Sequence, residues 1–352
     1  MSSTLSDDIK RLKTEFPYTS VESLHGIPKK TKLPASSLLE ELGKLSKLIK
    51  SNATKLGIIS TPDKISNNED AFKTQMVELM NVVFYLLSLV PLFHDSHFAD
   101  YFINKLDNDI VSLVQSIHKL SDELVEIVNS DAKDFKDPII AEDEKLAKFL
   151  KERLISIGML WSQCEHLELL SNQGNLGLLT EYLSSSVKLL QDSIEELEEW
   201  LEDPVINSDP FGMNDKFSDE EGTDLDEEEE EEASESMIEF VKSLSQKSRL
   251  LKLLLSSLSK SITIKKDTVT TAAYLSELNQ LHNSIVSNSD TLISSTLVNA
   301  EYEVDPEVET SVLAINNDVK KVIKIITQLN GSDESKLKWI QVWSNKWSSL
   351  NN

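Results

Sequence analysis

The sequence predicts an all-α protein with two antiparallel helical bundles joined by an acidic disordered linker. Glycine and proline, nine each in 352 residues, make up about 5% of the chain against about 12% in average proteins. Aromatic residues contribute only 6%, which disfavours a β-sandwich or barrel. Apolar residues make up 39% of the chain, enough for a core at this length. The length itself suggests about two domains.

The negative charge is concentrated in one segment. The net charge is −25, but residues 195–232 hold 19 acidic residues against one basic residue, and thus carry −18 of it. The remainder of the chain carries only −7. Nucleic-acid binding needs a concentrated positive surface, and the three lysines of the segment 27–32 are too few to supply one. Direct binding to nucleic acid is therefore not expected.

The first two parts of the chain are an N-terminal segment (1–33), which reads as a short helix followed by irregular chain, and a five-helix bundle (34–203). Apolar residues at helical spacing and proline or polar interruptions define the five helices. We expect them from Pro34 to before Pro62, Glu69–Val90 ending near Pro91, Phe98–Val128, Glu142–Leu170, and from the turn Asn172–Asn175 to Leu201.

The fourth of these helices carries an apolar stripe that we expect to face the core. Its members are Leu146, Phe149, Leu150, Leu154, Ile157, Leu160 and Trp161. Long helices joined by short loops are what an up-and-down bundle requires, because each must bury a stripe against its neighbours.

The segment 204–235 has a different character and is predicted to be a disordered linker. Within it, 11 of the 14 residues 219–232 are acidic, and like-charge repulsion with few apolar groups leaves nothing to offset the entropy of ordering. We call these residues the acidic tract: Asp219, Glu220, Glu221, Asp224, Asp226, Glu227, Glu228, Glu229, Glu230, Glu231 and Glu232.

A second helical bundle is expected over residues 236–352. Its helices are predicted from Met237 to Ile262, from Thr268 to Leu297, from Pro306 to the turn 330–332, and from there to Trp347. Gly331 in that turn is typical of a helix C-terminus.

The composition points to the cytoplasm and nucleus. The single cysteine, Cys164, excludes an intramolecular disulfide framework, and the first 33 residues contain no hydrophobic signal core. The most apolar run, Val82–Phe93, is shorter than the roughly 20 residues that a bilayer requires. It is better interpreted as an interior helix of the bundle.

No catalytic or cofactor motif is present in the sequence. His94 and His97 have a spacing that can hold a metal on a helix, but no second His or Cys pair lies nearby in sequence. Cys164 and His166 occupy positions that point in different directions on a helix, so a structural cysteine is expected rather than a nucleophile. Phosphate-binding and hydrolase signatures are also missing. We therefore expect neither an enzyme nor a metal or cofactor site.

Trp339, Trp343 and Trp347 lie on one face of the last predicted helix, at intervals of four residues. A stripe of this kind usually closes a bundle, and we favour that interpretation. The alternative is a partner-docking face, because tryptophan is enriched at interface hot spots.

The acidic tract admits three interpretations. It can act as a solvated spacer between the bundles, or as a polyanion that binds basic partners such as histones. It can also be regulated, since Ser218 and Thr223 are each followed by acidic residues, as at sites for casein-kinase-2-type kinases. Phosphorylation there would add up to about −2 per site.

The order of these features resembles one known family. A leucine-rich N-terminal bundle beginning near Leu38, a helix end containing Trp200, the motif Asp209-Pro210-Phe211-Gly212 before the acidic tract, and the run 304–308 before the penultimate helix are similar to the cyclin-D-binding protein (GCIP) family. The resemblance implies a non-enzymatic, all-helical protein of nucleus and cytoplasm. It also implies partners such as D-type cyclins and helix–loop–helix transcription factors, without carrying over any binding residue.

The leading hypothesis is thus a regulator of the cell cycle or of transcription that acts by stoichiometric binding through its helix faces. Two alternatives stay open: a vinculin-like helical scaffold or adaptor, and an acidic chaperone for basic proteins such as histones.

Overall fold

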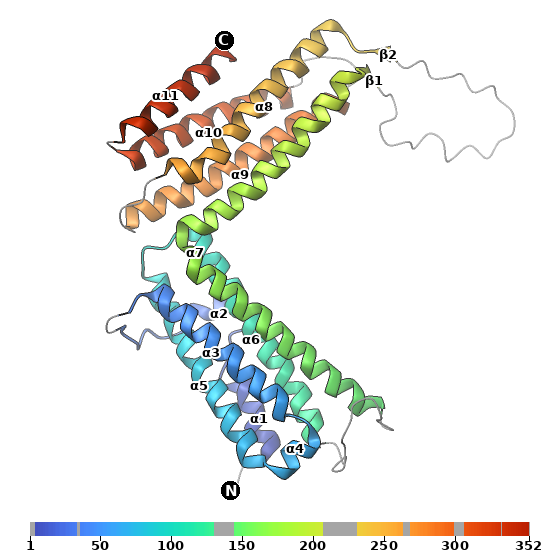
Figure 1. The fold of residues 1–352 in the computed structure, drawn as a ribbon, viewed down its shortest axis with the longest axis vertical. Coiled ribbons are helices and arrows are strands. Elements are labelled where there is room, and N and C mark those ends of the chain that lie inside the picture. The colour runs from blue at the N-terminus through green and yellow to red at the C-terminus, as the bar shows by residue number, and fades with distance from the viewer. Residues whose placement is uncertain are drawn as a thin grey trace, which may run out of the picture. The chain divides into compact units, whose positions relative to one another are not determined.

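The computed structural model describes residues 4–33, 36–129, 144–206, 231–262, 268–298, 306–331 and 333–351. These residues are almost entirely helical, which confirms the all-α prediction (Figure 1). The chain divides into two compact units, Met1–Leu178 (unit 1) and Leu179–Asn352 (unit 2). Residues 207–230 of the predicted linker lie outside the described residues.

Unit 1 contains three short helices and four long helical segments. The short ones are α1 (Leu5–Thr14), α2 (Val21–Leu24) and α4 (Pro62–Asn67). The long ones are α3 (Leu38–Ile59), α5 (Glu69–His94), α6 (Asp100–Asn129) and the part of α7 (Glu144–Glu202) that ends at Leu178. Helix α3 begins at Leu38 rather than near Pro34, because Ser37 and Glu40 form a reciprocal capping box there.

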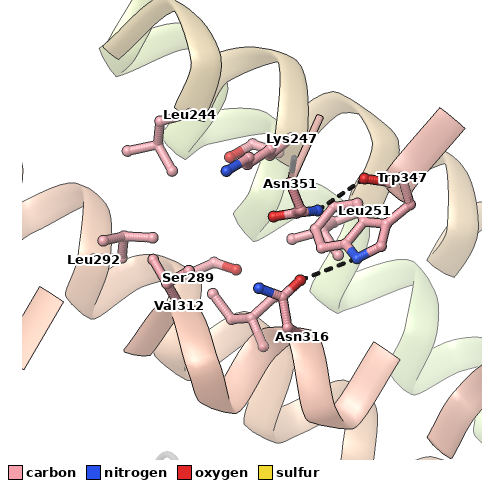
Figure 2. A pocket seen from close by; sticks show the side chains of 11 residues that line it. Leu244, Lys247, Leu251, Ser289, Leu292, Val312, Asn316, Trp347 and Asn351 are labelled. Atoms are coloured by element: carbon pink, nitrogen blue, oxygen red, sulfur yellow. Dashed lines mark hydrogen bonds between the residues drawn. The ribbon is translucent and has the colours of Figure 1, made fainter. Parts of the chain in front are cut away.

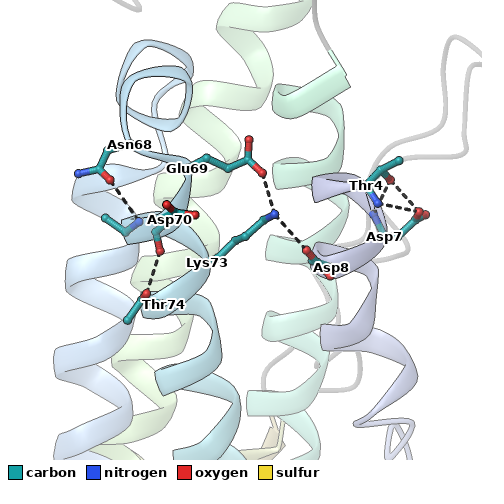
Figure 3. A network of polar contacts seen from close by, with 9 residues as sticks. Thr4, Asp7, Asp8, Asn68, Glu69, Asp70, Lys73 and Thr74 are labelled. Atoms are coloured by element: carbon teal, nitrogen blue, oxygen red, sulfur yellow. Dashed lines mark hydrogen bonds and ion pairs between the residues drawn. The ribbon is translucent and has the colours of Figure 1, made fainter. Parts of the chain in front are cut away.

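The N-terminal segment is part of the unit 1 core rather than a mostly irregular extension. Helix α1 packs on α6, and Ile9, Leu12, Phe16 and Leu24 are buried. Lys73 of α5 bridges Glu69 (2.7 Å) and Asp8 of α1 (3.5 Å), as Figure 3 shows. The same view shows the side chains that cap the two helix starts: Thr4 with Asp7 on α1, and Asn68 on α5.

Helix α5 does not stop at Pro91 as predicted but continues to His94. Proline lacks the N–H that would bond to the carbonyl of residue 87, yet Val90 and Phe93 on either side of it are buried. Their packing holds the helix together across the missing hydrogen bond. Among the described helices, α5 is the one long and apolar enough to span a membrane, and 56% of its most apolar window is buried inside unit 1. Packed core helices share this composition.

Helix α7 contains the predicted turn as a local break. Gly174 adopts φ 58° and ψ −164°, a region that essentially only glycine occupies. The next residue, Asn175, anchors the break: its Oδ1 accepts from the Ala99 amide at 2.9 Å, and its carbonyl accepts from the Tyr101 hydroxyl at 2.6 Å.

Unit 2 contains the rest of α7, helices α8 (Glu235–Ser261), α9 (Val269–Val298), α10 (Pro306–Asn330) and α11 (Glu334–Ser349), and two two-residue strands. The strands β1 (Val205–Ile206) and β2 (Glu231–Glu232) pair antiparallel and bring the ends of the undescribed segment together. The predicted turn before α11 is confirmed by Gly331, whose φ is 54°.

The expected domain boundary at residue 203 differs from the structure, which divides the chain at residues 178 and 179. Residues 179–202 pack with α8 and α9: Ser186 bonds His282 at 3.1 Å, and Glu198 pairs with Arg249. A composition change marks the acidic segment, but tertiary packing assigns the preceding helix to the second unit.

Candidate protein-docking surfaces

The tryptophan face of α11 lies largely inside unit 2. Trp343 is only 3% exposed, Trp347 is also buried, and Trp339 is half-buried. The rings of Trp343 and Trp347 stack with centroids 5.5 Å apart. Trp343 Nε1 donates to the Leu250 carbonyl at 3.0 Å and Trp347 Nε1 to Asn316 Oδ1 at 3.1 Å. These satisfied indoles match the bundle-core interpretation.

A small cavity beside Trp347 is shown in Figure 2. Its volume is about 20 Å³, enough for roughly one water molecule. Lys247 lines the cavity, and burial lowers the pKa of its ammonium group. The space is too small for a ligand or a partner's side chain.

The two candidate metal ligands, His94 and His97, have different surroundings. His94 ends α5, and its Nε2 lies 3.0 Å from both carboxylate oxygens of the buried Asp107, while His97 is exposed in the following connection. Across the described part of the chain, no group of three or more His, Cys, Asp or Glu side chains is placed to hold a metal. His94 instead joins α5 to α6.

Cys164 is buried, and burial raises the pKa of its thiol to about 12. A thiol in this state stays protonated and is a poor nucleophile. The exposed His166 lies two residues further along α7. The arrangement is that of a structural cysteine.

Ser218, Thr223 and the acidic tract up to Glu230 lie outside the described residues, so their predicted roles stay predictions. Glu231 and Glu232 form strand β2.

The first part of α7 exposes an apolar surface that the sequence analysis did not anticipate. Leu154 and Trp161, predicted to face the core, are exposed. We call the following exposed apolar residues the α7 face: Leu154, Ile155, Met159, Trp161 and Leu169. Gly158 lies among them, and a Cβ added there would meet no atom within 4 Å.

The reason for the misassignment is that α7 has more apolar residues than one stripe can hold. The buried stripe consists of Leu150, Ile157, Leu160, Cys164 and Leu167. Apolar residues on the opposite side of a helix indicate a second contact surface. That excess is the sequence signal that could have revealed the α7 face.

Unit 2 carries an acidic groove between α7 and α9. Its volume is about 490 Å³. Asp192, Glu196 and Asp290 line it with the exposed Leu189, and its floor includes Ser186 and Val286. None of the three carboxylates pairs with a cation within the described ranges.

Part of the chain is similar to a known family. Residues 41–203 match the family model described as Grap2 and cyclin-D-interacting, N-terminal. The resemblance expected from the sequence is thereby confirmed over those residues. The α7 face lies within this range.

Two curated relatives cover nearly the whole chain. The uncharacterized protein YLR287C of Saccharomyces cerevisiae is 29% identical, over 99% of each chain. The uncharacterized protein C22E12.18 of Schizosaccharomyces pombe is 25% identical, over 97% of this chain and 88% of the relative. No solved structure matches.

Proposed function

Since residues 41–203 form a GCIP N-terminal domain, we propose that this chain is a non-enzymatic regulator in cell-cycle or transcription control. It acts by stoichiometric binding of a protein partner, and it works in the cytoplasm and the nucleus. The buried, protonated Cys164 and the His94–Asp107 pair, which are structural in their surroundings, support a role without catalysis.

The proposal rests on the exposure of the α7 face. Its five apolar side chains lie exposed on one stretch of helix in unit 1. Full burial of a large apolar side chain contributes about 1.5–3 kcal/mol. The side chains of the α7 face are between 38% and 56% exposed, so a partner that covers them gains part of this amount at each one. An amphipathic helix of the partner is the complementary surface, because apolar residues on one helix pack into the ridges of another.

The partner class follows from the description of the matched family, which names cyclin D. We infer that a cyclin-like protein, or a helix–loop–helix regulator, docks on the α7 face.

The test is a binding measurement between the purified full-length chain and a purified D-type cyclin by biolayer interferometry. Ile155→Arg places a charge in the α7 face, and we expect it to weaken binding at least about tenfold. Leu313→Arg on α10 is the matched control. Ile155 and Leu313 are both 56% exposed, so neither change buries a charge.

If Ile155→Arg and Leu313→Arg bind the cyclin equally well, the α7 face is not part of the interface. A cyclin that does not bind the unmodified chain would contradict the cyclin assignment. The same assay with a helix–loop–helix protein then tests the remaining partner class.

A second candidate function, an acidic chaperone for basic proteins, is favoured by the acidic groove of unit 2. Three unpaired carboxylates beside Leu189 suit a cationic, partly apolar segment. Histone binding by this route should fall steeply with added salt. It should also weaken in Asp192→Asn/Glu196→Gln and persist in Ile155→Arg.

A further inference from the structure

Unit 1 also has a concave site, which lies between the N-terminal segment and α5. Its volume is about 250 Å³. We call it the aromatic pocket, and its apolar lining consists of Phe16, Tyr18, Ile27, Pro28, Phe84 and Leu87. Lys30 contributes a charge at the same place. The pocket is separate from the α7 face, and seven of its ten lining residues precede the matched family range.

The wall formed by the N-terminal segment is held by hydrogen bonds and an ion pair to α6 and the α5–α6 connection. His118 Nε2 donates to the Phe16 carbonyl at 2.7 Å, and Gln115 Nε2 donates to the Thr19 carbonyl at 3.0 Å. Lys29 pairs with Asp95. Since the wall is anchored on both sides of the pocket, the cavity is formed before any partner arrives, which lowers the entropy cost of binding.

The rim of the pocket includes an exposed aromatic side chain, Phe84 of α5. Phe84 is 61% exposed, and its ring meets Tyr85 edge to face at 5.9 Å between centroids. Tyr18 makes no hydrogen bond with another described residue, so its hydroxyl is free for a ligand. Exposed aromatic side chains at a preformed cavity are typical of interaction hot spots.

The lining of the pocket carries one basic residue, Lys30, and one acidic residue, Glu15. The N-terminal segment that forms one wall has a net charge of +2, from six Lys and Arg against four Asp and Glu, in a chain of −25. Lys30 and Lys32 have no carboxylate partner within the described residues. The acidic residue of the pocket, Glu15, is already paired with Arg11. A complementary ligand therefore carries carboxylates next to its apolar group.

We propose that the aromatic pocket binds a short acidic segment of a partner protein, with one Phe or Leu side chain inserted between Tyr18, Ile27 and Phe84. A carboxylate that flanks this side chain lies against Lys30. The apolar side chain supplies most of the affinity, and the carboxylates orient the segment and speed its association.

The experiment uses the full-length chain and a fluorescein-labelled peptide in which one Phe is flanked on both sides by Asp and Glu. Fluorescence anisotropy measures its affinity, and two control peptides replace the Phe by Ala or the acidic residues by Asn and Gln. We expect both control peptides to bind at least about tenfold more weakly, and added salt to weaken the Phe-containing acidic peptide.

Two pairs of variants assign the binding to the pocket. Phe84→Ala should weaken it about tenfold, whereas Val77→Ala, at a 45% exposed position of the same helix, should not. Lys30→Glu should weaken it, whereas Lys151→Glu, at an exposed lysine of α7, should not. All four side chains are exposed, so folding is retained and circular dichroism can verify it.

The proposal is overturned if the Phe and Ala peptides bind alike, or if Phe84→Ala and Lys30→Glu bind as their controls do. Self-association of the chain that is lost in Phe84→Ala, without peptide binding, would instead assign the pocket to a second copy. Neither result bears on the α7 face, because Ile155→Arg leaves the pocket intact.

Discussion

At the scale of single residues, His282 uses both ring nitrogens inside unit 2. Asn279 Oδ1 accepts from Nε2 and the Ser186 hydroxyl donates to Nδ1, both at 3.1 Å. Burial lowers the pKa of His282 to about 4. The imidazole is therefore neutral in the folded chain well below the pH at which it gains a proton in the unfolded chain.

This predicts a loss of stability in mild acid. Between pH 6.5 and 4 the imidazole of His282 is protonated in the unfolded chain but neutral in the folded chain. The free energy of unfolding therefore falls as the pH falls. From pH 7 to pH 5 the contribution of His282 amounts to about 2 kcal/mol. Urea unfolding at the two pH values, followed by tryptophan fluorescence, measures it.

His282→Gln should remove this part of the pH dependence, while His166→Gln, at an exposed histidine, should leave it unchanged. If His282→Gln retained the full pH dependence, other groups would be responsible.

At the scale of one element, two glycines of α7 should respond oppositely to alanine. Gly174→Ala forces a side chain onto a backbone with φ 58°, and should destabilise the protein by about 1–3 kcal/mol. Gly158 is an exposed helical position with open space around its Cβ. Gly158→Ala should therefore stabilise by about 0.5–1 kcal/mol. Chemical unfolding of both variants measures the two changes in the free energy of unfolding. If both variants were destabilised, or both stabilised, the prediction would be wrong.

A second prediction for a single element concerns the tryptophan face of α11, which is either bundle core or a docking surface. Trp343→Ala leaves a large cavity and removes the indole hydrogen bond to the Leu250 carbonyl, so we expect the free energy of unfolding in urea to fall by about 3–5 kcal/mol. The neighbouring Val342 is 62% exposed, and Val342→Ala should cost less than about 0.5 kcal/mol. A Trp343→Ala variant of normal stability that lost a partner would make this face a docking surface after all.

At the scale of the whole molecule, the short strands offer a way to remove the acidic segment. Val205 pairs with Glu232 and Ile206 with Glu231, so an Asn-Gly turn can replace residues 207–230. The replacement removes eleven acidic residues and one lysine and changes the net charge from −25 to −15.

We expect this replacement to stabilise unit 2 by about 1–2 kcal/mol, because a shorter loop loses less entropy on closure. Urea unfolding of the replaced and unmodified chains gives the difference. Reduced stability would mean that residues 207–230 supply contacts of their own. Binding through the α7 face should be unchanged. Loss of histone binding in the replaced chain would assign that binding to the acidic segment rather than to the acidic groove, which the replacement leaves intact.

Much of the local structure could be predicted from short-range pattern. Helical spacing of apolar residues gave the long helices, and Gly174 and Gly331 marked the break in α7 and the turn before α11. Pro91 was the exception, because the burial of Val90 and Phe93 outweighs one missing hydrogen bond.

The candidate sites were less predictable, because exposure depends on which neighbour covers a residue. Leu154 and Leu150 have the same side chain and lie one turn apart on α7, yet one is exposed and the other buried. Phe16 and Phe84 are some 70 positions apart in sequence, and only the folded N-terminal segment brings them to one pocket.

The sequence by itself determined the helical class, the acidic segment and the absence of catalytic motifs, because composition and periodicity are local properties of the chain. Tertiary structure alone decided that α7 is shared between two units, that Trp343 and Trp347 are buried, and that the α7 face and the aromatic pocket are open. The physical reason is that a helix repeats every 3.6 residues whatever surrounds it. Which of its faces loses contact with water is set by surfaces distant in the sequence.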